Sequence, residues 1–390
     1  MSRRKATVLL FLILLPMLTG CWNMKELEHM FYAHAIGVDY QNGEYRMYVQ
    51  ILDFSKLSKT EGGGGGEDGG TGAWIGRGAG KTLYDALHDL YSSSQREIYW
   101  GHLNTIILSD KLFHQEKYLE AMDILTRYGE LRYTPWLFAT GNNVEDILLV
   151  SPVLERSPVY SQLSDPFDVF EQSSFIPPIR LNRFFARLLE PASTLLVPFI
   201  GSVGDKWEDA KQTYDALEVK GAYFIRNKQL KAELPKSQLQ GLRWMNEQTR
   251  RTPLVLGSEK QTVSLVFEKI DTDIVPHIEE NGLYFDVRVS AKGGVIGDAK
   301  TVSAADLQKQ AEQRIRQEIA DTFMRGIEKK ADVYNLMEVA YRKVPREWKR
   351  IAAANGFPLR ADSIRSIRVD VRITNAGKNN KPLPETGSKP

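Results

Sequence analysis

The stretch SAADLQKQAEQRIRQEIADTFMRGIEKK, residues 303–330, is strongly periodic and decides the fold of the second half of the chain. Ser303 and Asp306 have the spacing of a helix capping box. Apolar residues then recur every four positions, at Leu307, Ala311, Ile315, Ile319, Phe323 and Ile327. Because four residues advance about 400° around an α-helix, this stripe drifts by about 40° per step. A two-stranded coiled coil needs a period of about 3.5 residues, so the drift favours a helix that crosses a twisted sheet.

Two segments that flank this helix in the sequence alternate apolar and polar residues, the pattern of strands covered on one face only. Their apolar positions are Leu283, Phe285, Val287 and Val289 in the first, and Ile367, Val369, Val371 and Ile373 in the second. Glu218–Arg226 and Thr262–Phe267 are further predicted strands. The patterns predict a multi-lobed α+β fold, in which a C-terminal antiparallel sheet is covered by the helix that begins at Ala304.

The domain organisation follows from where the pattern changes. Residues 201–216 are polar and lack a strong period, so we place a boundary there. It separates an N-terminal α+β region, 21–205, from a C-terminal α+β domain, 215–376. Residues 61–80 contain 11 glycines and are predicted to form a flexible loop that leads into a helix capped by Thr82 and Asp85. The polar residues 377–390 are predicted to be a disordered tail.

Composition narrows the function classes. The chain has 390 residues, enough for two or three domains, and is 42% hydrophobic, so it can bury real cores. Its formal net charge is +2, but Arg3, Arg4 and Lys5 precede all the acidic residues, and the remainder is nearly neutral. No basic block is left for a nucleic-acid surface. Cys21 is the sole cysteine, which excludes disulfides, thiolate zinc sites and a cysteine nucleophile from the folded regions.

The N-terminus has the three parts of a lipoprotein signal peptide, predicted over residues 1–20. A basic start is followed by the apolar run Val8–Leu18, which is shorter than the ~20 residues that a membrane-spanning helix needs. Leu18-Thr19-Gly20-Cys21 then reads as a lipobox. The alternatives are an ordinary signal peptide and a short membrane anchor. We predict that the Cys21 thiol carries diacylglycerol, after which the peptidase cuts between Gly20 and Cys21.

Three motifs that would indicate chemistry lack the required context. Gly76–Thr82 ends like a phosphate-binding loop, but Ile75 stands where the first glycine is needed. Leu383–Gly387 matches a sortase sorting signal, yet no apolar span follows it. The histidines form no metal-ligand pair; they are His29, His34, His88, His102, His114 and His277. The sequence therefore predicts no cofactor, no metal site and no catalytic residue.

Short motifs along nearly the whole chain resemble those of the Ger(x)C spore-germination lipoproteins. Cys21 is followed by Trp22 and by Glu26-Leu27, although Asn23 replaces the usual Asp. The other matches are Gly37-Val38-Asp39, Gly80-Lys81-Thr82, Tyr99-Trp100-Gly101-His102-Leu103, Ile106-Ile107-Leu108, Arg127-x-x-Glu130-x-Arg132, Gly221-Ala222-Tyr223-Phe224, Gly241-Leu242-x-Trp244, Asp332 and Pro345-x-x-Trp348. The glycine that follows Asp332 in the family is missing here.

The resemblance implies a non-catalytic C subunit of a nutrient germinant receptor. Such proteins are lipid-anchored to the outer face of the spore inner membrane and act with an A subunit and a polytopic B subunit. Trp100 and His102 flank Gly101 at the mouth of an apolar strand, and a charge cluster of Arg127, Glu130 and Arg132 is expected nearby. We expect these residues to serve packing and orientation rather than chemistry.

Two other classes remain open on the sequence alone. A substrate-binding lipoprotein of an importer would need two similar α/β lobes around a cleft, and the two halves here have different patterns. An envelope hydrolase acting on peptidoglycan would need paired carboxylates or a metal site, and neither is evident.

Overall fold

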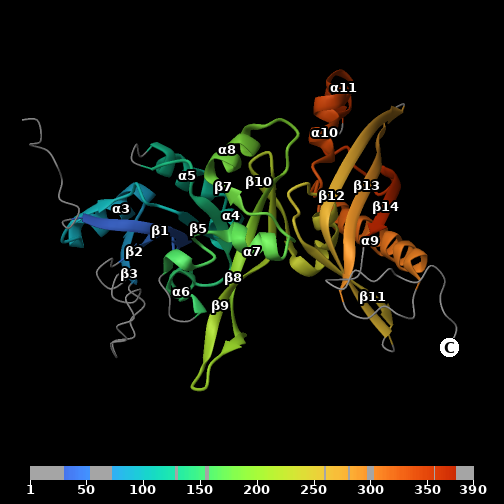
Figure 1. The fold of residues 1–390 in the computed structure, drawn as a ribbon. Coiled ribbons are helices and arrows are strands. Elements are labelled where there is room, and N and C mark those ends of the chain that lie inside the picture. Colours follow the sequence, from blue (N-terminus) through green and yellow to red (C-terminus); the bar gives the residue numbers. More distant parts are fainter. Residues whose placement is uncertain are drawn as a thin grey trace, which may run out of the picture.

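The structure is a computed structural model that describes residues 30–52, 73–127, 131–153, 158–258, 261–279, 282–296, 303–354 and 356–374. Its two halves, each built on one β-sheet, lie side by side along the length of the molecule (Figure 1). The predicted signal peptide, Cys21 and the tail 377–390 lie outside the described residues.

The first sheet is mixed, with strand order β10-β9-β8-β6-β5-β1-β2-β3; β4 and β7 pair beside it with β1 and β6. Its strands are β1 (Met30–Gln41), β2 (Glu44–Leu52), β3 (Ala73–Gly80), β4 (Glu97–Tyr99), β5 (Thr105–Ser109), β6 (Trp136–Thr140), β7 (Ile179–Arg180), β8 (Leu195–Glu208), β9 (Thr213–Arg226) and β10 (Gln229–Pro235). The central pairs β1–β5, β5–β6 and β6–β8 are parallel, and antiparallel hairpins extend the sheet at both ends.

Helices cover both faces of this sheet. One face carries α3 (Leu83–Ser93), α4 (Asp110–His114), α5 (Tyr118–Arg127) and α8 (Leu181–Leu189). The other carries α6 (Val144–Leu149) and α7 (Pro166–Gln172), with the short 3-10 helix η4 (Pro158–Tyr160) between them in sequence. Glu116 adopts a left-handed φ of 56° between α4 and α5 and separates the two helices.

The glycine-rich segment contains a strand where we predicted only a loop. Residues 61–72 lie outside the described residues, but 73–80 form β3, which pairs with β2. Gly76, Gly78 and Gly80 alternate along it and leave one side of the strand bare, so that α3 packs against its backbone. A Cβ on Gly78 would lie 2.0 Å from the carbonyl oxygen of Ala86. The glycines therefore serve helix packing, and a period of two was the signal that the loop prediction missed.

The start of α3 agrees with the prediction. The Thr82 hydroxyl accepts a hydrogen bond from the Asp85 amide at 3.1 Å, and the Asp85 carboxylate accepts one from the Thr82 amide at 3.2 Å. This reciprocal pair is a capping box. Lys81, the residue that a phosphate-binding loop would use, instead makes an exposed ion pair with Glu44 at 3.2 Å.

We expect Gly78→Ala to lower the free energy of unfolding by about 1–3 kcal/mol, because the new methyl group forces α3 away from β3. Urea unfolding of both proteins measures the difference. Gly356→Ala is the matched control, since a Cβ there meets nothing within 4 Å. Equal midpoints for the Gly78 and Gly356 variants would contradict the close packing described above.

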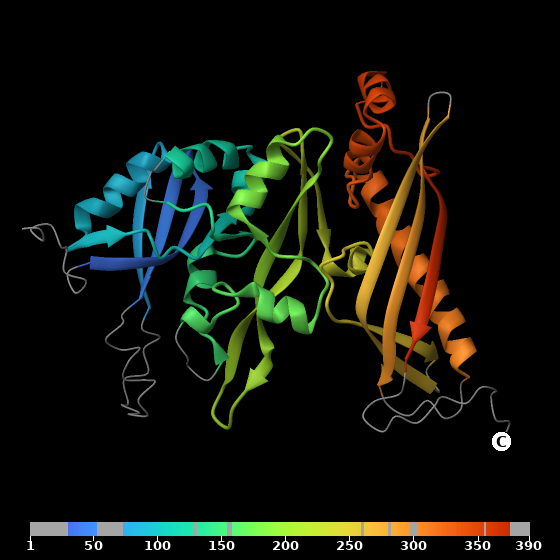
Figure 2. The same cartoon turned by 45° about the horizontal axis from the view of Figure 1, so that its top comes forward.

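The second half is a four-stranded sheet of order β11-β12-β13-β14 with the long helix α9 crossing one face (Figure 2). Its elements are β11 (Thr252–Ser258), β12 (Gln261–Glu279), β13 (Gly282–Ile296), α9 (Ala304–Glu328), α10 (Leu336–Lys343), α11 (Pro345–Ala354) and β14 (Ile364–Ile373). The α+β fold and the sheet covered by a long helix are confirmed. The sheet differs from the prediction at its last strand, because β14 pairs parallel with β13. The chain between them passes through three helices, which lets it return in the same direction.

Helix α9 follows the predicted stripe closely. Leu307, Ala311, Ile315, Ile319 and Phe323 are buried, and Ile327 packs beside them. Ser303 caps the helix by accepting a hydrogen bond from the Asp306 amide at 3.1 Å. The reciprocal half of the predicted box differs, since the Asp306 carboxylate accepts from the Ser303 hydroxyl at 2.7 Å instead of from its amide.

The expected boundary at 201–216 falls within the long hairpin of β8 and β9. Strands β9 and β10 then complete the first sheet, so the chain changes sheet after Pro235. Two 3-10 helices, η5 (Lys236–Gln238) and η6 (Gln240–Trp244), connect β10 to β11, and η6 packs against α9. Phe224 and Leu234 of the first sheet pack into the same hydrophobic cluster as α9, so one core continues from one half into the other.

Candidate functional site

The segment Tyr99–Leu103 lies at the N-terminal end of β1, where β4 pairs parallel with β1 and Tyr32 is in register with Tyr99. Trp100 is only 2% exposed and packs in the core beneath α3. Its Nε1 donates a hydrogen bond to the Tyr91 hydroxyl at 2.9 Å. A Cβ at Gly101 would lie 2.4 Å from the Tyr99 hydroxyl oxygen, so the glycine makes room for that ring. Trp100 is therefore a core residue that serves packing.

Next to this buried tryptophan, three rings gather at the surface. The ring centroids of Tyr32 and Tyr99 are 5.8 Å apart, and His102 lies 5.4 Å from Tyr32 and 5.7 Å from Tyr99. Tyr99 is 38% exposed, and His102 is also exposed. Edge-on and tilted contacts of this kind hold aromatic rings in a fixed arrangement. We call Tyr32, Tyr99 and His102 the aromatic face.

The expected charge cluster of Arg127, Glu130 and Arg132 is described only in part. Arg127 donates a hydrogen bond to Asp123 on its own helix at 2.8 Å, and both side chains are largely exposed. This pair raises the pKa of Arg127. Arg132 is exposed, and Glu130 lies outside the described residues. Pairs at i and i+4 on an exposed helix contribute only about 0.3–0.5 kcal/mol.

A buried histidine network links strands β1 and β2 with the loop before α7, and sequence reasoning missed it. His34 Nδ1 is 2.7 Å from Gln50 Oε1, and the Ser164 Oγ is 2.9 Å from His34 Nε2. The Gln50 amide nitrogen donates to the Leu148 carbonyl at 2.6 Å. Burial lowers the pKa of His34, which favours the neutral ring. A serine protease triad stabilises its charged histidine with a carboxylate, whereas here the third group is a neutral amide, so this network is better suited to structure than to catalysis.

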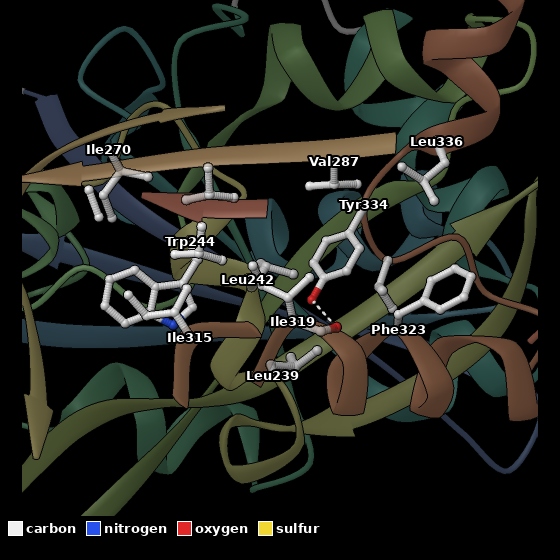
Figure 3. Packing of buried hydrophobic residues seen from close by; sticks show 14 of the residues in the cluster. Leu239, Leu242, Trp244, Ile270, Val287, Ile315, Ile319, Phe323, Tyr334 and Leu336 are labelled. Atoms are coloured by element: carbon white, nitrogen blue, oxygen red, sulfur yellow. Dashed lines mark hydrogen bonds between the residues drawn. The ribbon is translucent and has the colours of Figure 1, made fainter. Parts of the chain in front are cut away.

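A second missed cluster surrounds Glu318, a charged residue on the apolar side of α9. Its carboxylate accepts hydrogen bonds from Arg243 and from the Trp244 ring nitrogen, each at 2.7 Å. Arg243 is 4% exposed and Glu318 is 7% exposed. Figure 3 shows Trp244 beside Ile315 in this core, where the Tyr334 hydroxyl donates to the Ile319 carbonyl at 2.9 Å. The sequence signal for this cluster was Glu318 itself, a charged residue three positions after Ile315 of the apolar stripe.

The other C-terminal motif residues are also structural. A Cβ on Gly241 would lie 2.4 Å from the Glu318 carbonyl oxygen, so the glycine lets η6 lie directly on α9. Asp332 accepts hydrogen bonds from the Leu336 and Met337 amides at 2.9 and 2.7 Å, which satisfies the start of α10. Burial raises the pKa of Asp332 to about 6.

Polar contacts join the two halves beside α10. Arg187 of α8 donates to Glu338 of α10 at 2.7 Å. The Asn335 side chain accepts from the Thr194 amide at 2.7 Å, with Asn335 held in a left-handed φ of 54°. Asparagine tolerates this conformation, which explains why the missing glycine after Asp332 does not prevent the turn.

A partly open cleft of about 220 Å³ lies between α7 and the start of the β8–β9 hairpin. Its walls are mostly apolar and include Phe138, Phe170 and Phe175. At its edge Glu218 is surrounded by Lys206, Lys220 and Lys236 at 2.8, 3.1 and 3.5 Å. Although partial burial opposes ionisation of Glu218, its bonds to the lysines lower its pKa to about 2. This carboxylate therefore stays charged and paired.

Neither a metal centre nor a membrane span is found in the part of the chain that the structure describes. No group of three or more His, Cys, Asp and Glu side chains in that part is arranged to hold a metal ion. None of the helices in that part has the length and hydropathy needed to cross a bilayer. The predicted attachment residue, Cys21, lies outside it.

Proteins named as spore germination proteins are similar to this chain over most of its length. It is 24% identical to spore germination protein KC of Bacillus subtilis (strain 168), over 98% of both chains. It is also 24% identical to spore germination protein B3 of the same organism, over 74% of this chain and 73% of that one. The crystal structure of the GerBC protein aligns with a TM-score of 0.55 at 16% identity, covering 87% of this chain and 97% of that chain, so the two share a fold.

Two family models match consecutive parts of the sequence. Residues 23–202 match the spore germination protein N-terminal domain. Residues 220–377 match the spore germination B3/GerAC-like C-terminal domain. Together the two matches take in most of the chain, in the order in which such a protein carries the two domains, and the chain therefore belongs to this family of spore germination proteins.

Proposed function

We propose that this protein is a lipid-anchored, non-catalytic subunit of a nutrient germinant receptor. The observation that carries the proposal is the match of both family domains along one chain. In the proposal, the protein acts with A and B subunits on the outer face of the spore inner membrane. Its role is to bind and position these partners in a complex that responds to nutrients.

The proposed anchor rests on the lipobox that ends at Cys21. Its thiol is the sole thiol of the chain, so a thioether-linked diacylglycerol has one acceptor. One acyl chain binds a membrane only reversibly, whereas two chains give stable attachment. The two chains of a diacylglycerol therefore suffice to hold the protein at the membrane without a spanning helix.

The polar clusters support a role without catalysis. The His34 network is enclosed and ends in a neutral amide, and the Glu318 carboxylate is occupied by Arg243 and Trp244. The two halves also differ in strand number and order. This difference favours the receptor subunit over an importer's binding protein, whose two lobes would resemble each other.

We expect Cys21→Ala to abolish lipid labelling, because the thioether loses its acceptor. Cells that express either protein are fed a fatty-acid probe, and the tagged protein is isolated and its label measured. Asn23→Ala, two residues away, is the matched control and should label normally. Persistent labelling of the Cys21 variant would refute the anchor.

A further inference from the structure

The aromatic face lies at one end of the molecule, close to where the proposed anchor joins the fold. Met30 begins β1 and pairs with Glu97 of β4, and Tyr32 follows two residues later. Figure 1 shows the start of β1 at the end of the first sheet that points away from the second sheet. Cys21 precedes Met30 by nine residues, which extend over at most about 32 Å.

The side of the sheet that the three rings occupy is set by the alternation of β4. Ile98 and Trp100 belong to the core beneath α3, so Tyr99 between them lies on the opposite side. Helix α3 covers the side that contains Ile98 and Trp100, and its His88 side chain is exposed to solvent. The end of the molecule nearest the anchor therefore has a helical side and an aromatic side.

We propose that the aromatic face of Tyr32, Tyr99 and His102 rests in the lipid–water interface of the membrane that holds Cys21. The proposal rests on the lipid anchor of the proposed function. Tyrosine is enriched at this depth of a bilayer because its ring is apolar while its hydroxyl stays hydrated. Histidine likewise combines an apolar ring with polar nitrogens.

The position of the tether favours a lipid surface as the partner of the aromatic face. Attachment at Cys21 keeps this end within reach of the bilayer, so even a weak contact is made at high effective concentration. The contact selects the aromatic side, and with it the orientation that the protein presents to its partners.

Chemical footprinting on tethered protein tests the orientation. The mature chain, which begins at Cys21, is coupled through its single thiol to maleimide lipid in vesicles of phosphatidylglycerol and phosphatidylcholine. Flotation verifies the coupling. Diethylpyrocarbonate then modifies exposed histidines, and mass spectrometry follows the rate at each. Exposed His114 on α4 is the internal reference, and His88 reports on the helical side of the same end.

We expect His102 to react roughly threefold more slowly on vesicles than in solution, relative to His114, which corresponds to contact for about two thirds of the time. His88 should keep its solution rate. A Tyr99→Ser variant should lose most of the protection of His102 while remaining tethered. Equal His102 rates on vesicles and in solution would overturn the proposal, and so would protection of His88 in place of His102.

This experiment supplies the tether chemically, so its outcome is independent of lipidation in the cell. Fatty-acid labelling of Cys21 tests the natural anchor separately. Protection of His102 in intact spores but not on vesicles would assign the aromatic face to a protein partner and overturn the lipid contact.

Discussion

Glu318→Ala is expected to lower the free energy of unfolding by about 3–5 kcal/mol, because it leaves the buried guanidinium of Arg243 without its partner. Arg243 and Glu318 are both less than a tenth exposed, and Arg243 Nη2 lies 2.7 Å from Glu318 Oε2. The Trp244 ring nitrogen loses the same acceptor. An unpaired donor in a core costs a further share of this energy, since water cannot replace the lost bond.

Urea unfolding of the variant and its controls measures the effect. Glu328→Ala removes a carboxylate from the end of the same helix, where its pair with Arg325 is about half exposed. This control should change the free energy of unfolding by less than about 0.5 kcal/mol. The double variant Glu318→Leu with Arg243→Leu removes both charges and should recover a large part of the loss. A cost below about 1 kcal/mol for Glu318→Ala would show that Arg243 finds water in this core.

The sequence predicted the elements whose pattern is local. The stripe on α9 and the alternation of β13 and β14 depend on helical and strand periods, and both appear in the structure. The capping pair Thr82 and Asp85 is equally local, because three residues separate its members. The family resemblance, drawn from motifs in order along the chain, is also confirmed.

What the sequence did not predict depends on contacts between distant residues. Glu318 meets Arg243 across 75 positions, and Ser164 meets His34 across 130, so no spacing rule applies to them. The parallel direction of β14 follows from the path of three helices rather than from its own residues. The strand Ala73–Gly80 was missed because a high glycine content indicates a loop unless a packed helix makes bare backbone favourable.

The function proposed for the chain predicts loss of one receptor's response when the gene is deleted. A non-catalytic protein held at the membrane acts on the partners beside it, and its tether raises its effective concentration there. Its absence should therefore disable one complex and leave shared steps of germination intact. Cys21→Ala should have the same effect as the deletion, and Asn23→Ala should restore the response.

The most direct test is the germination of purified spores across a panel of nutrients, followed by loss of optical density and release of dipicolinic acid. With the gene deleted, we expect no response to the nutrients that its receptor senses. Responses through other receptors and to non-nutrient triggers should be unchanged. Normal responses to every nutrient, in a strain that has no paralogous C subunit, would contradict the proposed function.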